Sequence, residues 1–188
     1  MLHVRHHAPI AVAEDGDVLV CASVGAAGEV IVVWSAAENR PILTTPAAQG
    51  AGIVPDPRAP RTAPARVTVH APDIVSVVRI TRPGLANLTA QPLPGGNILL
   101  VGTGSHWHPE GADRNAVIYD AAGRVLAEEA LGDGIQHALA DSTGHVWVGY
   151  SDEGIYGNDT WEYLGRVIRG SGLIRFAPTS RLPGATPR

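Results

Sequence analysis

The chain has 188 residues, which is enough for one domain with a hydrophobic core, and we expect a single domain over residues 1–188. Hydrophobic residues make up 45% and charged residues 17% of the sequence, a balance that excludes a wholly disordered protein. The formal net charge is -4 and lysine is absent, so no basic run is available to bind a phosphate backbone, and we expect no nucleic-acid partner.

The first predicted element is a hairpin. Residues 8–35 have the pattern of two strands joined by a turn at Gly25–Gly28. The next segment, residues 36–65, is rich in Ala, Pro and Arg and is predicted to be a long irregular loop or linker. Because an unstructured loop of about 25 residues is uncommon in a compact domain, the segment is either a disordered insertion or hides a strand near Pro41–Thr45.

Strand-like patterns resume at residue 66 and at residues 73–80, and both segments are expected to be buried. Residues 122–131 contain helix-forming Ala and Glu, but a strand centred on Val125 and Leu126 fits the spacing of the neighbouring strands better. The tail, residues 177–188, is rich in proline and has no strand pattern, so we expect it to be disordered.

A short unit recurs three times: a turn glycine, an apolar run, a variable loop, and a second apolar run that ends in an aromatic residue. The apolar runs are residues 18–20 with 30–34, 98–101 with 115–119, and 146–148 with 172–176. Strands at such intervals are typical of radially repeated β-sheet folds. We therefore predict an all-β, β-propeller-like fold of about three four-stranded antiparallel blades that form an incomplete ring.

The segment Asp141–Tyr156, with an Asp-x-x-Gly turn before an apolar-Trp-apolar-Gly strand, resembles the blade motif of bacterial regulator-type β-propellers. Gly172–Phe176 is similar to the strand that closes such a blade. Leu93–Gly102, followed by Asn115–Gly123, resembles blades of NHL-like propellers with six or seven blades. The resemblance covers residues 91–176 and implies a fold rather than an activity. It also implies that this chain is a partial or truncated copy of a longer propeller.

One candidate site is the loop Gly102–Glu110, which contains His106, Trp107 and His108 and is followed by Asp113. Imidazoles and carboxylates this close in sequence are a ligand set for a divalent metal. Two histidines at a loop tip are, however, more often solvated or hydrogen-bonded, and no second pair has a matching spacing. We therefore assign no metal and no cofactor.

A second candidate loop spans residues 150–161 and carries Tyr150, Asp152, Glu153 and Trp161. Paired carboxylates can serve as general acid and base, as in glycosidic cleavage. Adjacent Asp152 and Glu153 would, however, point to opposite sides of an extended chain. Asp and Asn in such loops also commonly shape turns.

Asp133, which lies before the strand expected at residues 135–140, completes the candidate loop-face binding residues. Its simplest role is to initiate the turn before that strand. The sequence has no nucleophile elbow, no phosphate-binding loop and no dinucleotide fingerprint. No catalytic residue is therefore assigned.

Together these patterns favour a propeller-like binding or scaffold module, with a protein or a small polar ligand on its loop face. The alternatives are a hydrolase or lyase with a site on that face, which needs the loops around His106 and Asp152 to meet, and a truncated propeller without independent function. Self-association could complete the ring. With no apolar run long enough for a membrane helix and no signal-like N-terminus, we expect a cytoplasmic protein without a membrane partner.

Overall fold

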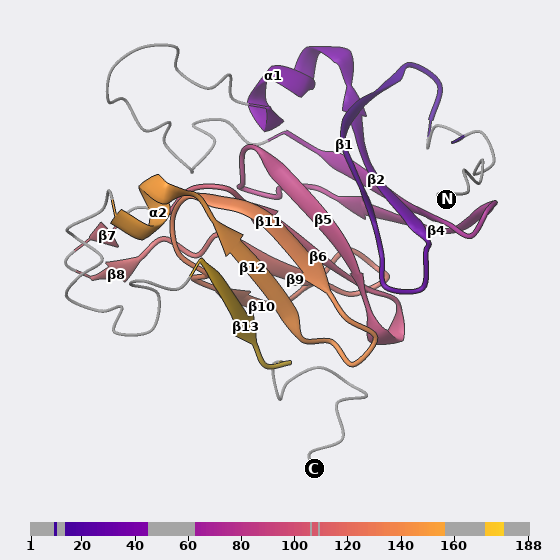
Figure 1. Cartoon of the computed structure of the whole chain (residues 1–188). Coiled ribbons are helices and arrows are strands. Elements are labelled where there is room, and N and C mark those ends of the chain that lie inside the picture. Colours follow the sequence, from indigo (N-terminus) through magenta and orange to yellow (C-terminus); the bar gives the residue numbers. More distant parts are fainter. Residues whose placement is uncertain are drawn as a thin grey trace, which may run out of the picture.

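The computed structural model describes residue 10 and residues 14–44, 63–105, 107–108, 110–156 and 172–178. Within these ranges the chain is mostly β-strand and forms three antiparallel sheets of three or four strands, together with one two-stranded hairpin (Figure 1). The all-β prediction is confirmed. The described residues form neither a closed barrel nor a closed ring of sheets.

The first sheet contains four consecutive antiparallel strands: β1 (Asp17–Val24), β2 (Val30–Ala36), β3 (Ala65–His70) and β4 (Ile74–Ile80). They confirm the predicted hairpin and the two strands after it. Strand β3 is buried, but in β4 the side chains of Ile74, Val75 and Val77 are exposed. The expectation that both would be buried is wrong for β4, because it is an edge strand with a neighbour on one side only.

Two short helices, η1 (Ala37–Asn39) and α1 (Arg40–Leu43), follow β2. They correct the prediction of irregular loop over this stretch and of a strand near residues 41–45. Pro41 lies in the first turn of α1, where the missing N–H costs no hydrogen bond. Leu43 is buried in the core, and Arg40 Nε donates to the Leu19 carbonyl at 2.8 Å. Residues 45–62 lie outside the described ranges.

The second sheet has the order β5 (Leu88–Leu93), β6 (Asn97–Gly102), β9 (Ala116–Tyr119), β10 (Val125–Glu129). The short helix η2 (Pro94–Gly96) connects β5 to β6. Strand β10 confirms the interpretation of residues 122–131 as a strand rather than a helix. A hairpin of β7 (Trp107–His108) and β8 (Gly111–Ala112) lies within the connection from β6 to β9.

The third sheet has three described strands, β11 (Ile135–Ala140), β12 (Val146–Tyr150) and β13 (Leu173–Phe176), where four were expected. A short helix, α2 (Asp152–Tyr156), follows β12 in a stretch for which the sequence predicted a loop. The predicted disordered tail lies outside the described ranges after residue 178.

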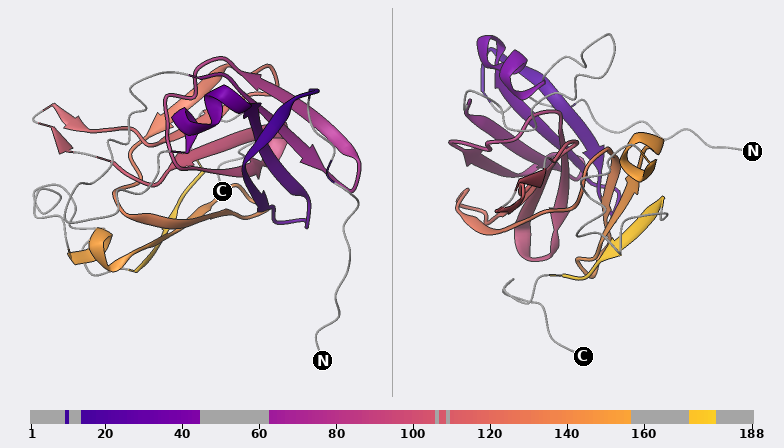
Figure 2. Two further views of the ribbon diagram at one scale, coloured as in Figure 1. Left: turned by 90° about the horizontal axis from the view of Figure 1, so that it is seen from above. Right: turned by 90° about the vertical axis from the view of Figure 1, so that its left-hand side faces the viewer.

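The second sheet lies between the other two and contributes to both hydrophobic cores (Figures 1 and 2). Its one face contributes Ala90, Ile98 and Leu100 to the core shared with the first sheet. Its other face contributes Leu99, Val101 and Ile118 to the core shared with the third sheet. The first strands of the three sheets are neighbours, because β5 contacts both β1 and β11.

Three hairpin turns repeat one backbone pattern, at Gly25–Glu29, Asp120–Arg124 and Asp141–His145. In each five-residue turn, the amide of the first residue donates to the carbonyl of the fifth. The fourth residue is a glycine with positive φ, and its amide donates to the carbonyl of the first residue. The carboxylates of Asp120 and Asp141 accept further bonds from the third and fifth amides. A side chain at Gly25 would collide with Pro92, and there Glu29 supplies the carboxylate to the Ala27 amide at 2.8 Å.

Candidate functional site

The connections after β6, β10 and β12 lie at one end of the molecule, together with the β7–β8 hairpin and α2 (Figure 1). The Ile135 amide donates to the Thr103 carbonyl at 2.9 Å, and the Ser151 amide donates to the Gly134 carbonyl at 2.9 Å. The segment before β11 therefore joins the two candidate loops. We call the described parts of these connections, residues 103–105, 107–108, 110–115, 131–134 and 151–156, the loop end.

Asn115 holds the loop end together through three buried hydrogen bonds. Its Nδ2 donates to the carbonyls of Gly102 at 3.1 Å and Gly132 at 2.7 Å. Its Oδ1 accepts from the Leu131 amide at 2.9 Å. Because the side chain is only 1% exposed, these backbone groups have little access to water, and Asn115 satisfies them instead.

Asp133, a predicted site residue, is 9% exposed and bonds across the loop end. Its Oδ1 accepts a hydrogen bond from the Ser105 amide at 3.0 Å. The Ser105 hydroxyl in turn donates to the Asp113 carbonyl at 2.7 Å. Asp133 therefore fastens the connection after β6 to the segment before β11, in addition to lying in the turn where the sequence placed it.

Tyr150, a second predicted site residue, is buried in the core between the second and third sheets. Its hydroxyl donates to the Leu131 carbonyl. Burial raises the pKa of the Tyr150 phenol, so the hydroxyl stays protonated and remains a donor at neutral pH. Tyr150 therefore bonds the end of β12 to the segment before β11.

Asp152 is exposed at the start of α2, and Glu153 follows it in the same helix. The helix lies close to the turn before β11, because a Cβ on Gly134 would be 2.6 Å from the Cα of Gly154. Gly134 also has a φ of +67°, which side chains rarely adopt. Glycine at both positions allows α2 to pack closely against the turn before β11.

Trp107 and His108 form the strand β7 of the β7–β8 hairpin at the loop end, and only their backbone is described. His106 and Trp161 lie outside the described residues. The described parts of the two loops thus occur at the same end of the molecule. No group of three or more His, Cys, Asp or Glu side chains suited to a metal ion occurs in the described part of the chain.

Sequence reasoning missed the importance of Ser105 and Asn115. The sequence pattern places Asn115 at the start of a strand and Ser105 within a loop. A polar residue directly before a buried strand was the available signal for Asn115, but its partners lie 13 to 17 residues away. Such partners depend on the fold and leave no spacing rule in the sequence.

A second network of buried side-chain hydrogen bonds lies in the first sheet and was not predicted. Trp34 Nε1 donates to the Thr68 hydroxyl at 2.7 Å, and that hydroxyl is hydrogen-bonded to His70 Nε2 at 2.8 Å. All three residues are buried. Arg66, which pairs with Trp34 across β2 and β3, binds Asp17, and the hydrogen bond to Asp17 raises the pKa of the Arg66 guanidinium. These bonds join β1, β2 and β3 of the first sheet.

No protein-family model, no curated protein and no solved structure matches this chain. None of the helices in the described ranges is long and apolar enough to cross a membrane.

Proposed function

We propose that this chain is a propeller-like binding or scaffold module whose loop end carries the binding surface. Three consecutive up-and-down sheets support the propeller-like architecture, because each begins with a strand that lies beside the first strand of its neighbour. The repeated Asp-x-x-Gly turns support it further. Blades arranged in this way commonly place variable connections at one end, where ligands bind.

The observation that carries the proposal is the buried hydrogen-bond cluster formed by Ser105, Asn115, Asp133 and Tyr150. Asn115 and Asp133 bond between the connections after β6 and after β10, Ser105 bonds within the first of these, and Tyr150 bonds the end of β12 to the second. The cluster therefore holds the connections after β6 and β10 in a defined arrangement before any ligand arrives, and the Ser151 amide joins the connection after β12 to them. Such preorganisation lowers the conformational entropy that binding must overcome, which is an advantage for a binding surface.

The Ser105 hydroxyl donates to the Asp113 carbonyl, and Asp133 accepts a hydrogen bond from the Ser105 amide, so both side chains help to position the connections of the loop end. The Asp152 carboxylate, in contrast, is exposed at the start of α2. We propose that Asp152 and the β7–β8 hairpin contact a protein or a small polar ligand.

The proposal is tested with a panel of probes: monosaccharides, free amino acids, nucleotides, and nitrophenyl esters, glycosides and phosphates as reporter substrates. We expect at least one small polar probe to raise the melting temperature of the chain, and we expect no turnover of the reporters. Trp107→Ala should weaken binding about tenfold or more, as expected for an aromatic contact residue. Leu139→Ser, on an exposed sheet face, is the control and should bind normally.

Turnover of a reporter that Asp152→Asn abolishes, with the fold intact by circular dichroism, would refute the proposal and support a hydrolase or lyase. Failure of every probe would exclude the small-ligand form of the proposal and leave a protein as the partner.

A further inference from the structure

The third sheet differs from the other two in its outer edge. The first and second sheets each have a fourth strand, and these strands supply buried or core-packed residues such as Val78 and Ile80 from β4 and Leu126 from β10. In the third sheet, β13 is the edge strand of the described residues. Its inward side chains, Ile174 and Phe176, contact the core but are only half-buried.

The pairing of β13 with β12 shows which backbone groups of β13 point to the other side of the strand, the edge of the described sheet. The Tyr150 amide donates to the Gly172 carbonyl at 3.0 Å, so residues 150 and 172 are a hydrogen-bonded pair. In an antiparallel ladder such pairs alternate, so Ile174 also bonds to β12. The N–H and C=O groups of Leu173 and Arg175 consequently point away from β12, toward the edge of the sheet at which no other described strand pairs.

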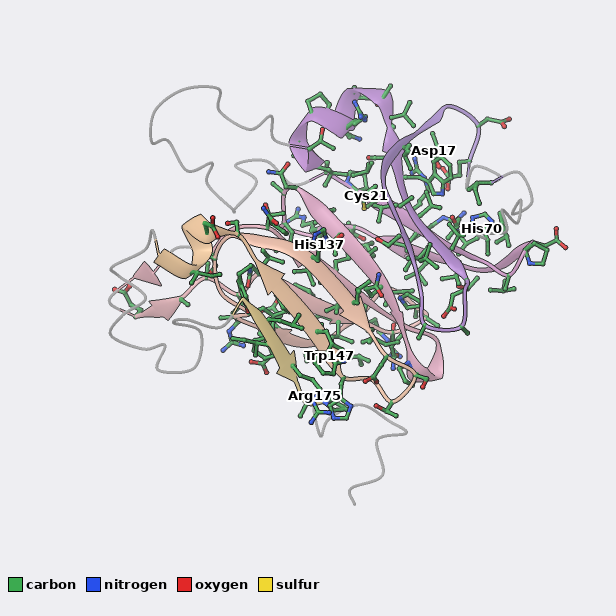
Figure 3. The ribbon with its side chains drawn as sticks, viewed as in Figure 1. Asp17, Cys21, His70, His137, Trp147 and Arg175 are labelled. Carbon is green, nitrogen blue, oxygen red and sulfur yellow. The ribbon has the colours of Figure 1, made fainter. Side chains whose placement is uncertain are left out.

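Arg175 does not block this edge. Charged side chains on edge strands often prevent pairing with another chain. Here the Arg175 guanidinium carbon lies 5.5 Å from the centre of the Trp147 ring, over the neighbouring strand (Figure 3). The Arg175 guanidinium therefore lies over the sheet rather than at its edge, and cation–π attraction to Trp147 stabilises this position.

We propose that β13 pairs antiparallel with β13 of a second copy of this chain, around a two-fold axis at Ile174. The outward backbone groups of Leu173 and Arg175 lie symmetrically on either side of that residue. Leu173 then exchanges two hydrogen bonds with the partner's Arg175, and the reverse pair forms by symmetry. The two three-stranded sheets become one six-stranded sheet.

The side chains of β13 fit this pairing. Ile174 meets the partner's Ile174 on the inner face, which covers two half-buried apolar side chains. Phe176 lies opposite the partner's Gly172, where no side chain competes for space. On the outer face Leu173, which is 60% exposed, lies beside the aliphatic stem of the partner's Arg175, so no like charges are directly opposed. This interface uses the sheet edge and is independent of the proposed binding role of the loop end.

The test measures the solution mass of the full chain by light scattering across a concentration series. We expect the mass to rise from 19.6 kDa to twice that value as concentration increases. Arg175→Pro removes one outward N–H without removing an N–H that bonds to β12, and it should keep the chain at the monomer mass. Arg175→Ala removes the Trp147 contact but keeps the N–H, and it should still dimerise.

Leu139→Ser is the control for the outer sheet face, because Leu139 is 56% exposed on β11, away from the β13 edge. It should dimerise like the unaltered chain. Loss of the dimer in Leu139→Ser would overturn edge pairing and favour contact through the sheet face. A monomer at every concentration, or an Arg175→Pro variant that dimerises normally, would also overturn it.

If Arg175→Pro fails to fold, hydrogen exchange of the unaltered chain decides. The amides of Leu173 and Arg175 should exchange about tenfold more slowly at high protein concentration than at low concentration. Exchange that is independent of concentration would refute the pairing.

Discussion

The side-chain oxygen of Gln91 accepts a hydrogen bond from the Ala140 amide at 3.0 Å, joining β5 of the second sheet to β11 of the third. Gln91 is 1% exposed and lies on the middle one of the three adjacent first strands. Its Nε2 also lies 3.5 Å from the Val24 carbonyl at the end of β1. One amide side chain thus contacts the first strands of both neighbouring sheets.

Gln91→Leu should therefore lower the free energy of unfolding by about 1–3 kcal/mol, because it leaves the buried Ala140 amide without its acceptor. Urea unfolding followed by circular dichroism measures the change. Gln136→Leu, at an exposed position of β11, is the matched control and should change stability by about 0.5 kcal/mol or less. Equal effects of the two substitutions would mean that the Gln91 bond does not join the sheets in solution.

Gly123→Ala and Gly28→Ala test the close approach of the first and second sheets. Both glycines occupy the same turn position, with φ of +75° and +85°, so alanine should cost about 1 kcal/mol at either site from backbone strain. A Cβ at Gly28 meets nothing within 4 Å, whereas one at Gly123 would collide with the Arg79 carbonyl. Gly123→Ala should be the more destabilising by at least about 1 kcal/mol in urea unfolding. Similar losses for both would contradict this packing.

Asp141→Asn tests the turn between β11 and β12. Hydrogen bonds, first that from the Thr143 hydroxyl and then those from backbone amides, lower the pKa of Asp141 to about 2. Because the pKa of Asp141 is lower in the folded chain than in the unfolded chain, where it is 3.8, the ionised carboxylate stabilises the folded chain above pH 3.8. This stabilisation is lost as the pH falls toward 2. The variant should be less stable by about 0.5 kcal/mol at pH 7, a small effect because the carboxylate is solvent-exposed.

The stability difference between Asp141→Asn and the unaltered chain should therefore narrow between pH 5 and pH 2, which thermal melts across that range would show. A constant difference over that range would mean that the ionised carboxylate does not hold the turn. Asp152→Asn, at an exposed helix position, should have little effect on stability at any pH in the series.

Tyr150→Phe tests the hydrogen bond between the Tyr150 hydroxyl and the Leu131 carbonyl at the loop end. Removing the hydroxyl leaves the buried Leu131 carbonyl without this donor, and we expect a loss of about 1–2 kcal/mol in urea unfolding. Tyr119→Phe is the control, because Tyr119 is also buried but its hydroxyl makes no hydrogen bond within the described residues. Equal stabilities of the two variants would show that the Tyr150 bond contributes nothing to the loop end.

Cys21 should be nearly inert toward thiol reagents in the folded chain. Burial raises the pKa of the Cys21 thiol to about 12, despite a hydrogen bond from Val33 that lowers it. The thiol is therefore protonated at pH 8, and its reaction with a disulfide reagent should be at least about a hundredfold slower than in urea. Equal rates in both conditions would indicate that β1 opens readily from the core.

The local pattern of the sequence was sufficient for the first hairpin and for the described strands of the third sheet. Alternating apolar residues and Asp-x-x-Gly or glycine turns located the hairpin of β1 and β2 and the strands of the third sheet, because strand burial and positive φ leave a short-range signal. The helix α1 was not predicted, because the proline-rich composition of residues 36–65 indicated an irregular loop, although a proline also fits the first turn of a helix.

The tertiary structure alone decided which loops meet and which polar residues hold them. Asp133 and Tyr150 were candidates from the sequence, but Asn115 and Ser105 were not, since their partners lie at distances in the chain that no periodicity encodes. The edge of the third sheet likewise depends on which strands pair. Local conformation follows from neighbouring residues, whereas hydrogen bonds between connections depend on how the sheets pack.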